Sequence, residues 1–304
     1  MSMAPDTDLP DTEHKGLIGL LPRTARPYAS LARFDRPIGW WLLYWPCAWG
    51  LALAGGVRDH WPLFGWLLIG AIAMRGAGCV YNDIVDRDLD ARVARTASRP
   101  LASGAVRVRN AWVWLALLCA IGLVVLLQLR GFAQIVALGS LALVAAYPFM
   151  KRITWWPQAW LGLVFSWGAL VGWAAVTGSV PRGAILLYVG SVFWVIGYDT
   201  IYALQDREDD ALVGIRSSAR ALGDNVRFGV ASCYAAALGF WLLAFWQVRS
   251  DWIALAALIP AALHLFWQAA SLDPASGDDA LAKFRSNRTE GLLIALACLA
   301  VGSA

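Results

Sequence analysis

Two short segments of this chain gather acidic side chains at spacings that a helix would bring onto one face. In residues 81–90, Asn82, Asp86 and Asp90 follow one another at intervals of four, and Asp83 adjoins the first of them. Side chains three or four residues apart lie on the same side of a helix. The segment therefore predicts a cluster of oxygen atoms on one helical face.

The second segment, residues 198–210, repeats this chemistry. Asp199, Asp206 and Asp210 are separated by seven and four residues, which again favours one face of a helix. Residues 85–90 align with residues 205–210 at a separation of 120 residues. The repetition resembles a parallel internal duplication, in which both acidic patches can face one cavity.

A cluster of carboxylates in a membrane segment is costly without a cation. An aspartate near the centre of a transmembrane helix raises the free energy of membrane insertion by about 2.5 to 3.5 kcal/mol. Like charges on one helical face also repel each other. Acids outnumber Arg87 and Arg207, so a hard divalent cation with oxygen ligands is the economical explanation. Mg²⁺ in proteins is usually bound by a few carboxylates together with phosphate oxygens of a substrate. The acidic segments therefore predict a phosphorylated substrate. For Asp88, Glu208 and Asp209, a solvated loop is an equally good interpretation.

Basic side chains that a polyanion would need lie near both segments. Arg75 precedes Asn82 by about two helical turns, inside an apolar run where surface anchoring is implausible. Tyr147 and Lys151 are one helical turn apart. The remaining candidates on the same side are Arg95, Arg99, Arg152, Arg216 and Arg220. Ordinary anchoring at the cytoplasmic surface is the preferred interpretation for Arg107, Arg109, Lys283 and Arg285.

The composition decides which solvent surrounds these segments. The chain has 304 residues, of which 59% are hydrophobic and 15% charged, and its mean hydropathy is +0.57. Soluble domains carry roughly 25% charged residues, so an integral membrane protein is favoured over a pair of soluble domains. The net charge of +4 is too small and too dispersed to indicate a nucleic-acid binder.

Nine apolar runs have about the 20 residues that a helix needs to cross the hydrocarbon core. They are residues 38–57, 62–81, 111–129, 132–147, 156–176, 184–204, 228–248, 252–270 and 289–303. The runs are apolar on all sides, as expected for helices that contact lipid and other helices. We therefore predict an all-α polytopic membrane protein with nine transmembrane helices.

The distribution of charge predicts the orientation. Most of the 25 Lys and Arg fall in the N-terminal segment and in the second, fourth, sixth and eighth loops. Positive charge is retained on the cytoplasmic side, so the N-terminus should be cytoplasmic and the C-terminus outside. The first residues show neither a secretory signal nor an acid-poor transit peptide, and we expect a bacterial inner (plasma) membrane. We predict that residues 1–29 form a flexible cytoplasmic tail and that residues 30–304 form a single transmembrane domain.

Several motifs resemble the UbiA family of intramembrane aromatic prenyltransferases. They occur in consistent order between about residue 30 and residue 291. They comprise residues 33–39, 74–83, Asp86, Asp90, 95–96, 99–101, 147–152, Thr154, 157–158, Gly162, 198–200, 202–203, Asp206, 209–210 and 214–215, with weaker echoes at Phe284, Asn287 and Gly291. Residues 33–39 and 147–152 are most similar to the 4-hydroxybenzoate polyprenyltransferase branch of the family.

The resemblance implies a fold and a reaction. The fold would be nine helices around a central cavity that opens sideways to lipid, under a cytoplasmic cap. The reaction would be the Mg²⁺-assisted loss of diphosphate from a polyprenyl diphosphate, followed by attack of the ring carbon ortho to a phenolic hydroxyl. In the branch named above, the acceptor would be 4-hydroxybenzoate and the pathway would be ubiquinone biosynthesis.

The resemblance also implies roles for individual residues. The metal set would be Asp83, Asp86, Asp90, Asp206 and Asp210. The residues that bind or brace the diphosphate would be Asn82, Arg33, Tyr147, Arg95, Arg152 and Arg216. Arg75 and Lys151 would contact phosphate oxygens or order the cap, while Asp199 would bind metal, orient the phenol or accept the ring proton. Relatives in this branch commonly carry Lys at position 216, and the planar fork of Arg216 makes different contacts from a point charge.

Two other classes of function stay open at this point. The first is a related prenyltransferase with another acceptor, such as a naphthoate, homogentisate or a porphyrin. The second is an ion-coupled transporter, because intramembrane acids and internal duplication also suit ion coupling. The length of the isoprenoid chain and the oligomeric state are not encoded in any recognisable motif.

Overall fold

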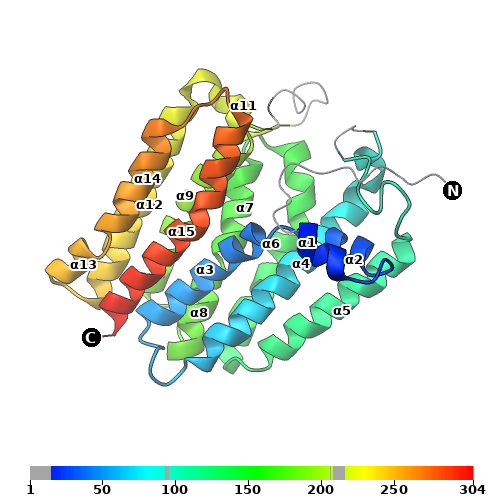
Figure 1. Ribbon diagram of the computed structural model, residues 1–304. Coiled ribbons are helices and arrows are strands. Elements are labelled where there is room, and N and C mark those ends of the chain that lie inside the picture. Colours follow the sequence, from blue (N-terminus) through cyan, green and yellow to red (C-terminus); the bar gives the residue numbers. More distant parts are fainter. Residues whose placement is uncertain (1–14, 93–95, 206, 208–215, 304) are drawn as a thin grey trace. The chain divides into compact units, whose positions relative to one another are not determined.

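Every regular element in the described part of the chain is a helix (Figure 1). The computed structural model describes residues 15–92, 96–205, 207 and 216–303, and for residues 15–17, 151 and 152 it describes the backbone alone. The helices are α1 (Lys15–Leu20), α2 (Arg26–Leu31), α3 (Ile38–Leu53), α4 (Pro62–Asp90), α5 (Val108–Leu126), α6 (Gly131–Ile153), α7 (Pro157–Ser166), α8 (Gly168–Thr177), α9 (Arg182–Tyr202), α11 (Ser218–Leu222), the 3₁₀ turn η1 (Gly223–Asn225), α12 (Val226–Val248), α13 (Trp252–Ala256), α14 (Ile259–Ser271) and α15 (Gly277–Gly302). The all-α prediction is confirmed.

Each of the nine apolar runs coincides with one helix or with a pair of helices. The run 156–176 forms α7 and α8, which meet at Trp167, and the run 252–270 forms α13 and α14. Within the described ranges, seven helical segments are long and apolar enough to cross a membrane. Helices α3 and α15 are not among them, because α3 has 16 residues and α15 carries charged side chains in its first half.

The chain divides into two compact units. The first contains Met1–Trp40 and Ile69–Val124, and the second contains Trp41–Leu68 and Val125–Ala304. The single transmembrane domain predicted for residues 30–304 stays a prediction. Helix α1 and the start of α2 lie within the predicted tail of residues 1–29, and residues 1–14 of that tail lie outside the described part.

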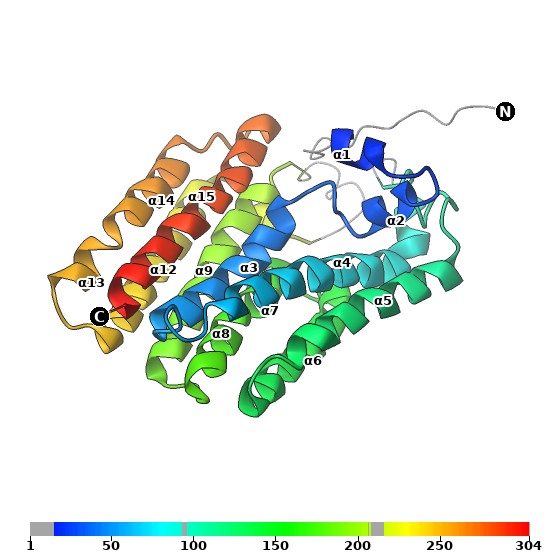
Figure 2. The ribbon, with the colours of Figure 1, turned by 60° about the horizontal axis from the view of Figure 1, so that its bottom comes forward.

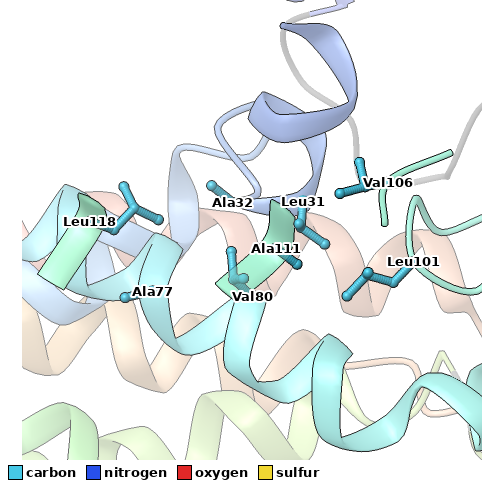
Figure 3. Close-up of a cluster of buried hydrophobic side chains, with 8 residues drawn as sticks. All are labelled: Leu31, Ala32, Ala77, Val80, Leu101, Val106, Ala111 and Leu118. Carbon is cyan, nitrogen blue, oxygen red and sulfur yellow. The ribbon is translucent and has the colours of Figure 1, made fainter. Parts of the chain in front are cut away.

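The core of the first unit holds α2 against α4 and α5. Its buried side chains come from these three helices and from the loop before α5, as Figure 3 shows. They are Leu31, Ala32, Ala77, Val80, Leu101, Val106, Ala111 and Leu118. Burying each large aliphatic side chain contributes about 1.5 to 3 kcal/mol in water. This cluster fixes the turn after α2, where Arg33 lies, relative to the acidic end of α4.

Helix α9 is central to the second unit. It packs against α7, α8, α12 and α15, and Figures 1 and 2 show α9, α12, α14 and α15 side by side. Trp49 of α3, Trp194 of α9 and Trp241 of α12 are fully buried there, with ring centroids of Trp49 and Trp194 5.0 Å apart. The indole nitrogen of Trp49 donates to the carbonyl of Gly291 at 2.9 Å. This tryptophan cluster therefore ties α3, α9, α12 and α15 into one core.

Glycines allow α3 and α8 to approach at backbone distance. A Cβ atom placed on Gly172 would collide with the carbonyl oxygen of Cys47, and one placed on Gly50 would collide with that of Ala169. Because the obstacles are backbone atoms, neither can move aside as a flexible side chain can. Small residues at a helix contact are typical of membrane proteins, where close packing drives association.

The α3–α8 contact predicts a specific sensitivity to one methyl group. Gly172→Ala should destabilise the protein by about 1 to 3 kcal/mol, the usual range for overpacking. The measurement is the midpoint of thermal unfolding in detergent. Gly239→Ala in the interior of α12 is the matched control, because a Cβ there meets no atom within 4 Å. Equal midpoints for the two variants would contradict the assignment.

Candidate active site

The first acidic motif is helical throughout, as predicted. Helix α4 continues without interruption to Asp90, so Asn82, Asp86 and Asp90 do follow one another along it. Asp83, Asp86 and Asp90 are buried, with exposed fractions of 2%, 0% and 5%. Three carboxyl groups are thus withdrawn from water at one end of a single helix. Such burial requires compensation by hydrogen bonds and opposite charge.

The other two charges of this motif point to solvent. Arg87 and Asp88 are exposed, and Arg87 Nη2 lies 2.9 Å from Asp88 Oδ1. An exposed ion pair between chain neighbours contributes little to stability. The side chain of Asp88 is thus solvated, although the residue lies on α4 and not in a loop.

Arg33 supplies part of the compensation for the buried acids. Its Nη2 donates to both carboxylate oxygens of Asp83, at 3.0 and 2.9 Å, and its Nη1 donates to the carbonyl of Ser30 at 2.9 Å. Burial is the largest single influence on the pKa of Arg33 and lowers it, but the charge and hydrogen bonds of Asp83, together with the nearby Cys79 and Asp35, outweigh burial and raise the pKa above its ordinary value. The guanidinium of Arg33 is thus engaged by Asp83 and braces the acidic end of α4.

The backbone of Arg33 is strained in reaching this position. Its φ is +58°, the left-handed region that residues other than Gly, Asn and Asp seldom adopt. Such a conformation costs about 1 to 3 kcal/mol and persists only where surrounding contacts enforce it. The paired contact with Asp83 and the packed core around α2 are contacts of that kind.

Arg99 links two of the buried acids. Its Nη1 lies 2.8 Å from Asp90 Oδ2 and 3.4 Å from Asp83 Oδ1. The hydroxyl of Thr96 donates to the backbone carbonyl of Asp90 at 2.9 Å, which ties the segment before Arg99 to the end of α4. The predicted site residue Arg95 lies outside the described residues.

Arg75 lies on α4, and its side chain is close to Gly39 in the first turn of α3. A Cβ atom on Gly39 would lie 2.8 Å from Arg75 Nε, so the absence of a side chain at position 39 makes room for the guanidinium. Arg75 is half-buried. The predicted role of Arg75 at the site stays a prediction.

The second acidic motif departs from the helical expectation. Helix α9 ends at Tyr202 and residues 203–205 form turns, so α9 does not carry a continuous face from Asp199 to Asp206. Asp199 is half-buried in the last turn of α9. Asp206 and Asp210 lie outside the described residues. Sequence spacing alone overestimated the length of this helix because the chain continues with good helix formers.

The end of α9 has an aromatic wall. Tyr198 is 1% exposed, and its ring packs on Trp194 with centroids 4.9 Å apart and on Phe284 at 5.8 Å. Tyr202 also packs on Phe284, with ring centroids 4.4 Å apart. Asp199 thus follows directly after a tyrosine whose position is fixed by rings from α9 and α15.

The segment after the second motif is anchored to its neighbours. Ser218 shares a hydrogen bond of 2.7 Å with Thr200 of α9, and its backbone N–H donates to Gln158 of α7 at 3.0 Å. Arg216 donates to the carbonyl of Ile153 at 3.0 Å and lies over the ring of Trp155. Arg216 therefore braces the last turn of α6.

That last turn belongs to the helix that carries the remaining predicted basic residues. Tyr147 is half-buried on α6, and Lys151 and Arg152 follow on the same helix, where their backbone alone is described. The sequence did not identify the Thr200–Ser218–Gln158 link. Its signal was the presence of polar residues in otherwise apolar runs.

The described residues suit phosphate and metal chemistry without forming a complete metal centre. Within the described ranges, no group of three or more His, Cys, Asp or Glu side chains is placed to hold a metal ion. Asp206 and Asp210 lie outside those ranges. The oxygen donors that α4 presents, carboxylates and the amide of Asn82, are of the kind that Mg²⁺ prefers.

Comparisons with known proteins agree with these motifs. The sequence profile of the UbiA prenyltransferase family matches residues 43–298. The mitochondrial 4-hydroxybenzoate polyprenyltransferase of Arabidopsis thaliana is 44% identical over 278 residues, which cover 90% of this chain and 68% of that protein. The human mitochondrial 4-hydroxybenzoate polyprenyltransferase is 44% identical over 280 residues, covering 90% of this chain and 75% of the other.

Solved structures share the fold. The apo structure of a UbiA homolog from Aeropyrum pernix K1 has a TM-score of 0.70 and 26% identity, and the match covers 84% of this chain and 96% of that one. A UbiA homolog from Archaeoglobus fulgidus bound to GPP and Mg²⁺ has a TM-score of 0.63 and 18% identity, over 91% of this chain and 100% of the other. The all-α membrane fold described above is thus the fold of these proteins.

The Arg33–Asp83 pair predicts a large effect from the loss of one charge. Asp83→Asn should lower the stability of the protein by about 3 kcal/mol, because it leaves the guanidinium of Arg33 without its buried counter-charge. The measurement is the thermal unfolding midpoint in detergent. Asp88→Asn is the matched control, since Asp88 is 80% exposed on the same helix and should change the midpoint little. If the two variants unfold at the same temperature, the brace is not what holds this region.

Proposed function

Because this chain belongs to the UbiA prenyltransferase family, we propose that it transfers the polyprenyl group of a polyprenyl diphosphate to 4-hydroxybenzoate, at the ring carbon ortho to the hydroxyl. The product class belongs to ubiquinone biosynthesis. The observation that carries the proposal is the set of buried carboxyl groups on α4, held in place by Arg33 and Arg99. The names of the Arabidopsis and human relatives support the choice of donor and acceptor.

The residues of α4 fit a magnesium ion. Asn82, Asp86 and Asp90 offer hard oxygen donors, and Mg²⁺ is usually bound by one or two carboxylates together with phosphate oxygens of a substrate. We assign Asp86 and Asp90 to this role together with Asp206 and Asp210 of the second motif. The Archaeoglobus homolog bound to GPP and Mg²⁺ supports the choice of metal. When bound, the ion would neutralise the charge that develops on the diphosphate.

The basic residues would act on the same developing charge. The leaving group becomes more negative as the allylic carbon–oxygen bond breaks, so cationic side chains stabilise the transition state more than the ground state. Lys151 and Arg75 would contact phosphate oxygens or order the cap, and Tyr147, Arg95, Arg152 and Arg216 would bind or brace the diphosphate. Arg33 takes the bracing role, because its guanidinium is engaged by Asp83.

The acceptor would be oriented near the end of α9. Asp199 would orient the phenol or accept the proton that the ring loses after alkylation, and the rings of Tyr198 and Phe284 would form an apolar wall beside it. An allylic cation reacts with water, so aromatic and aliphatic walls that exclude water protect it. The finer architecture of nine transmembrane helices around a central cavity under a cytoplasmic cap is part of the proposal.

The proposal includes a location. The chain is an integral membrane protein, and we place it in a bacterial inner membrane with a cytoplasmic N-terminus and an outer C-terminus. The distribution of Lys and Arg supports this orientation. The names of the Arabidopsis and human relatives assign those proteins to mitochondria.

Isolated membranes that contain this chain should prenylate 4-hydroxybenzoate in a magnesium-dependent manner. The measurement is radiolabelled product from polyprenyl diphosphates of several lengths, with 4-hydroxybenzoate, a naphthoate, homogentisate or a porphyrin as acceptor. We expect product from 4-hydroxybenzoate, its loss on addition of EDTA, and recovery when Mg²⁺ is restored. Product from another acceptor alone would overturn the substrate assignment, and activity that resists EDTA in washed membranes would overturn the role of the metal.

Single carboxylates in both motifs should be indispensable. Asp86→Ala and Asp206→Ala are expected to abolish turnover while the protein still inserts into the membrane at normal levels, since each would remove a metal ligand. The matched control is Asp88→Ala, whose exposed side chain should contribute nothing to catalysis. Full activity of a well-expressed Asp86→Ala or Asp206→Ala protein would refute the assignment of that residue.

A further inference from the structure

A chain of buried polar side chains crosses the second unit, apart from both acidic motifs. It joins α9, α12, α14 and α15, which lie side by side in Figures 1 and 2. Its members are Trp194, Tyr234, His264, Gln268, Asn287 and Glu290. His264 lies in none of the motifs that resemble the UbiA family. The hydrogen bonds now give this histidine a defined partner.

The direction of the hydrogen bonds is set at Trp194. An indole N–H can only donate, so the contact of 2.9 Å between Trp194 Nε1 and Asn287 requires the amide oxygen of Asn287 to face the ring. The amide nitrogen of Asn287 must then point the other way. It donates to the carbonyl of Lys283 at 3.0 Å and to Gln268 Oε1 at 3.3 Å.

The orientation of Asn287 fixes that of Gln268. The amide oxygen of Gln268 accepts from Asn287 and also from the hydroxyl of Tyr234, at 2.7 Å. Its amide nitrogen, which can only donate, therefore faces His264 Nδ1 at 3.4 Å. The same Nδ1 lies 2.9 Å from Glu290 Oε2. Whether His264 Nδ1 carries a proton or a lone pair decides which of the two residues, His264 or Glu290, holds the proton that they share.

Only one of the two arrangements avoids a clash of donors. If Nδ1 carried a proton and Glu290 were ionised, the N–H of Gln268 would point at another N–H. If Nδ1 carries its lone pair, Glu290 donates a proton to it at 2.9 Å, and the N–H of Gln268 shares the same lone pair through a longer contact of 3.4 Å. We propose that Glu290 is a neutral carboxylic acid that donates to His264 Nδ1, so that the proton shared by the two residues resides on the buried glutamate of α15.

The burial of Glu290 agrees with this assignment. Its exposed fraction is 0%, and in the part of the chain that the structure describes its only ion-pair partner is His264, which is 16% exposed. Glu290 Oε1 has no hydrogen-bond partner among the described residues. An unpaired oxygen of a carboxylate would be far more costly in an apolar interior than the carbonyl oxygen of a neutral acid.

The hydrogen bonds that start at Glu290 and His264 extend to the end of α9. The pair of His264 and Glu290 accepts from the amide nitrogen of Gln268. The amide oxygen of Gln268 accepts from Asn287, whose own oxygen accepts from the ring of Trp194. That ring packs on Tyr198, the residue before Asp199. Glu290 is therefore a positioning residue for the aromatic wall beside Asp199, and this part of the inference rests on the proposed function.

Infrared spectroscopy tests the protonation state without any turnover. The chain has only three glutamates, Glu13, Glu208 and Glu290, so glutamate labelled with ¹³C at the side-chain carboxyl reports on very few groups. Protein made by cell-free synthesis with labelled glutamate should show, at neutral pH, the carbonyl stretch of a protonated carboxylic acid that shifts with the label and on exchange into D₂O. The band should be absent from Glu290→Gln. A wild-type protein without the band would overturn the proposal.

Two substitutions test the direction of the hydrogen bond. Gln at position 290 offers an N–H donor to His264 in place of the acid, while Leu offers none. Glu290→Gln should unfold near the wild-type temperature, and Glu290→Leu clearly below it. If both variants lose stability equally, or if Gln is the worse of the two, an ionised Glu290 is required and the proposal fails.

A kinetic comparison tests the positioning role separately. Glu290→Leu should raise the KM for 4-hydroxybenzoate about tenfold, as expected for a change of about 1.4 kcal/mol, and leave the KM for the polyprenyl diphosphate unchanged. Glu290→Gln should restore the KM for the acceptor. Equal increases for both substrates would overturn the positioning role. Absence of turnover in the wild type would instead contradict the proposed function and leave the infrared result intact.

Discussion

A charged group that leaves water must meet an opposite charge or a set of hydrogen bonds, and the acidic end of α4 depends on that constraint. Asp83 is 2% exposed, and it meets Arg33 and Arg99 at once. Through Arg99 the same ion-pair system reaches Asp90. Three features hold these charges together. They are the strained backbone of Arg33, the hydrogen bond from Thr96 to the carbonyl of Asp90, and the buried core of the first unit.

The second unit meets the same constraint by a different route. Its buried polar groups are mostly uncharged residue types, and several of them are joined by hydrogen bonds between Trp194 and Glu290. Neutral hydrogen bonds are less costly to bury than ion pairs, because no charge has to be desolvated. The acidic end of α4 is rich in charge and the core around α9 is poor in it.

Membership of the UbiA family and the geometry of α4 answer different parts of the functional question. The family relationship indicates the class of reaction, whereas the structure indicates how individual residues contribute to it. Asp83 lies in a motif that resembles a metal site, yet both its oxygens accept from Arg33. Arg216 lies among residues expected to bind diphosphate, and it contacts the last turn of α6. In both cases the structure shows a contact with another part of the protein, and the predicted role at the metal or diphosphate stays a prediction.

The sequence by itself determined the local structure of this protein: its helices, its apolar runs and the spacing that puts Asn82, Asp86 and Asp90 along α4. These features follow from periodicity and hydrophobicity, which act over a few turns. Only the tertiary structure decided that Arg33 pairs with a residue fifty positions away, that α9 ends at Tyr202, and that His264 meets Glu290. Partners distant in the chain are chosen by packing, and no local spacing encodes which buried charge will meet which.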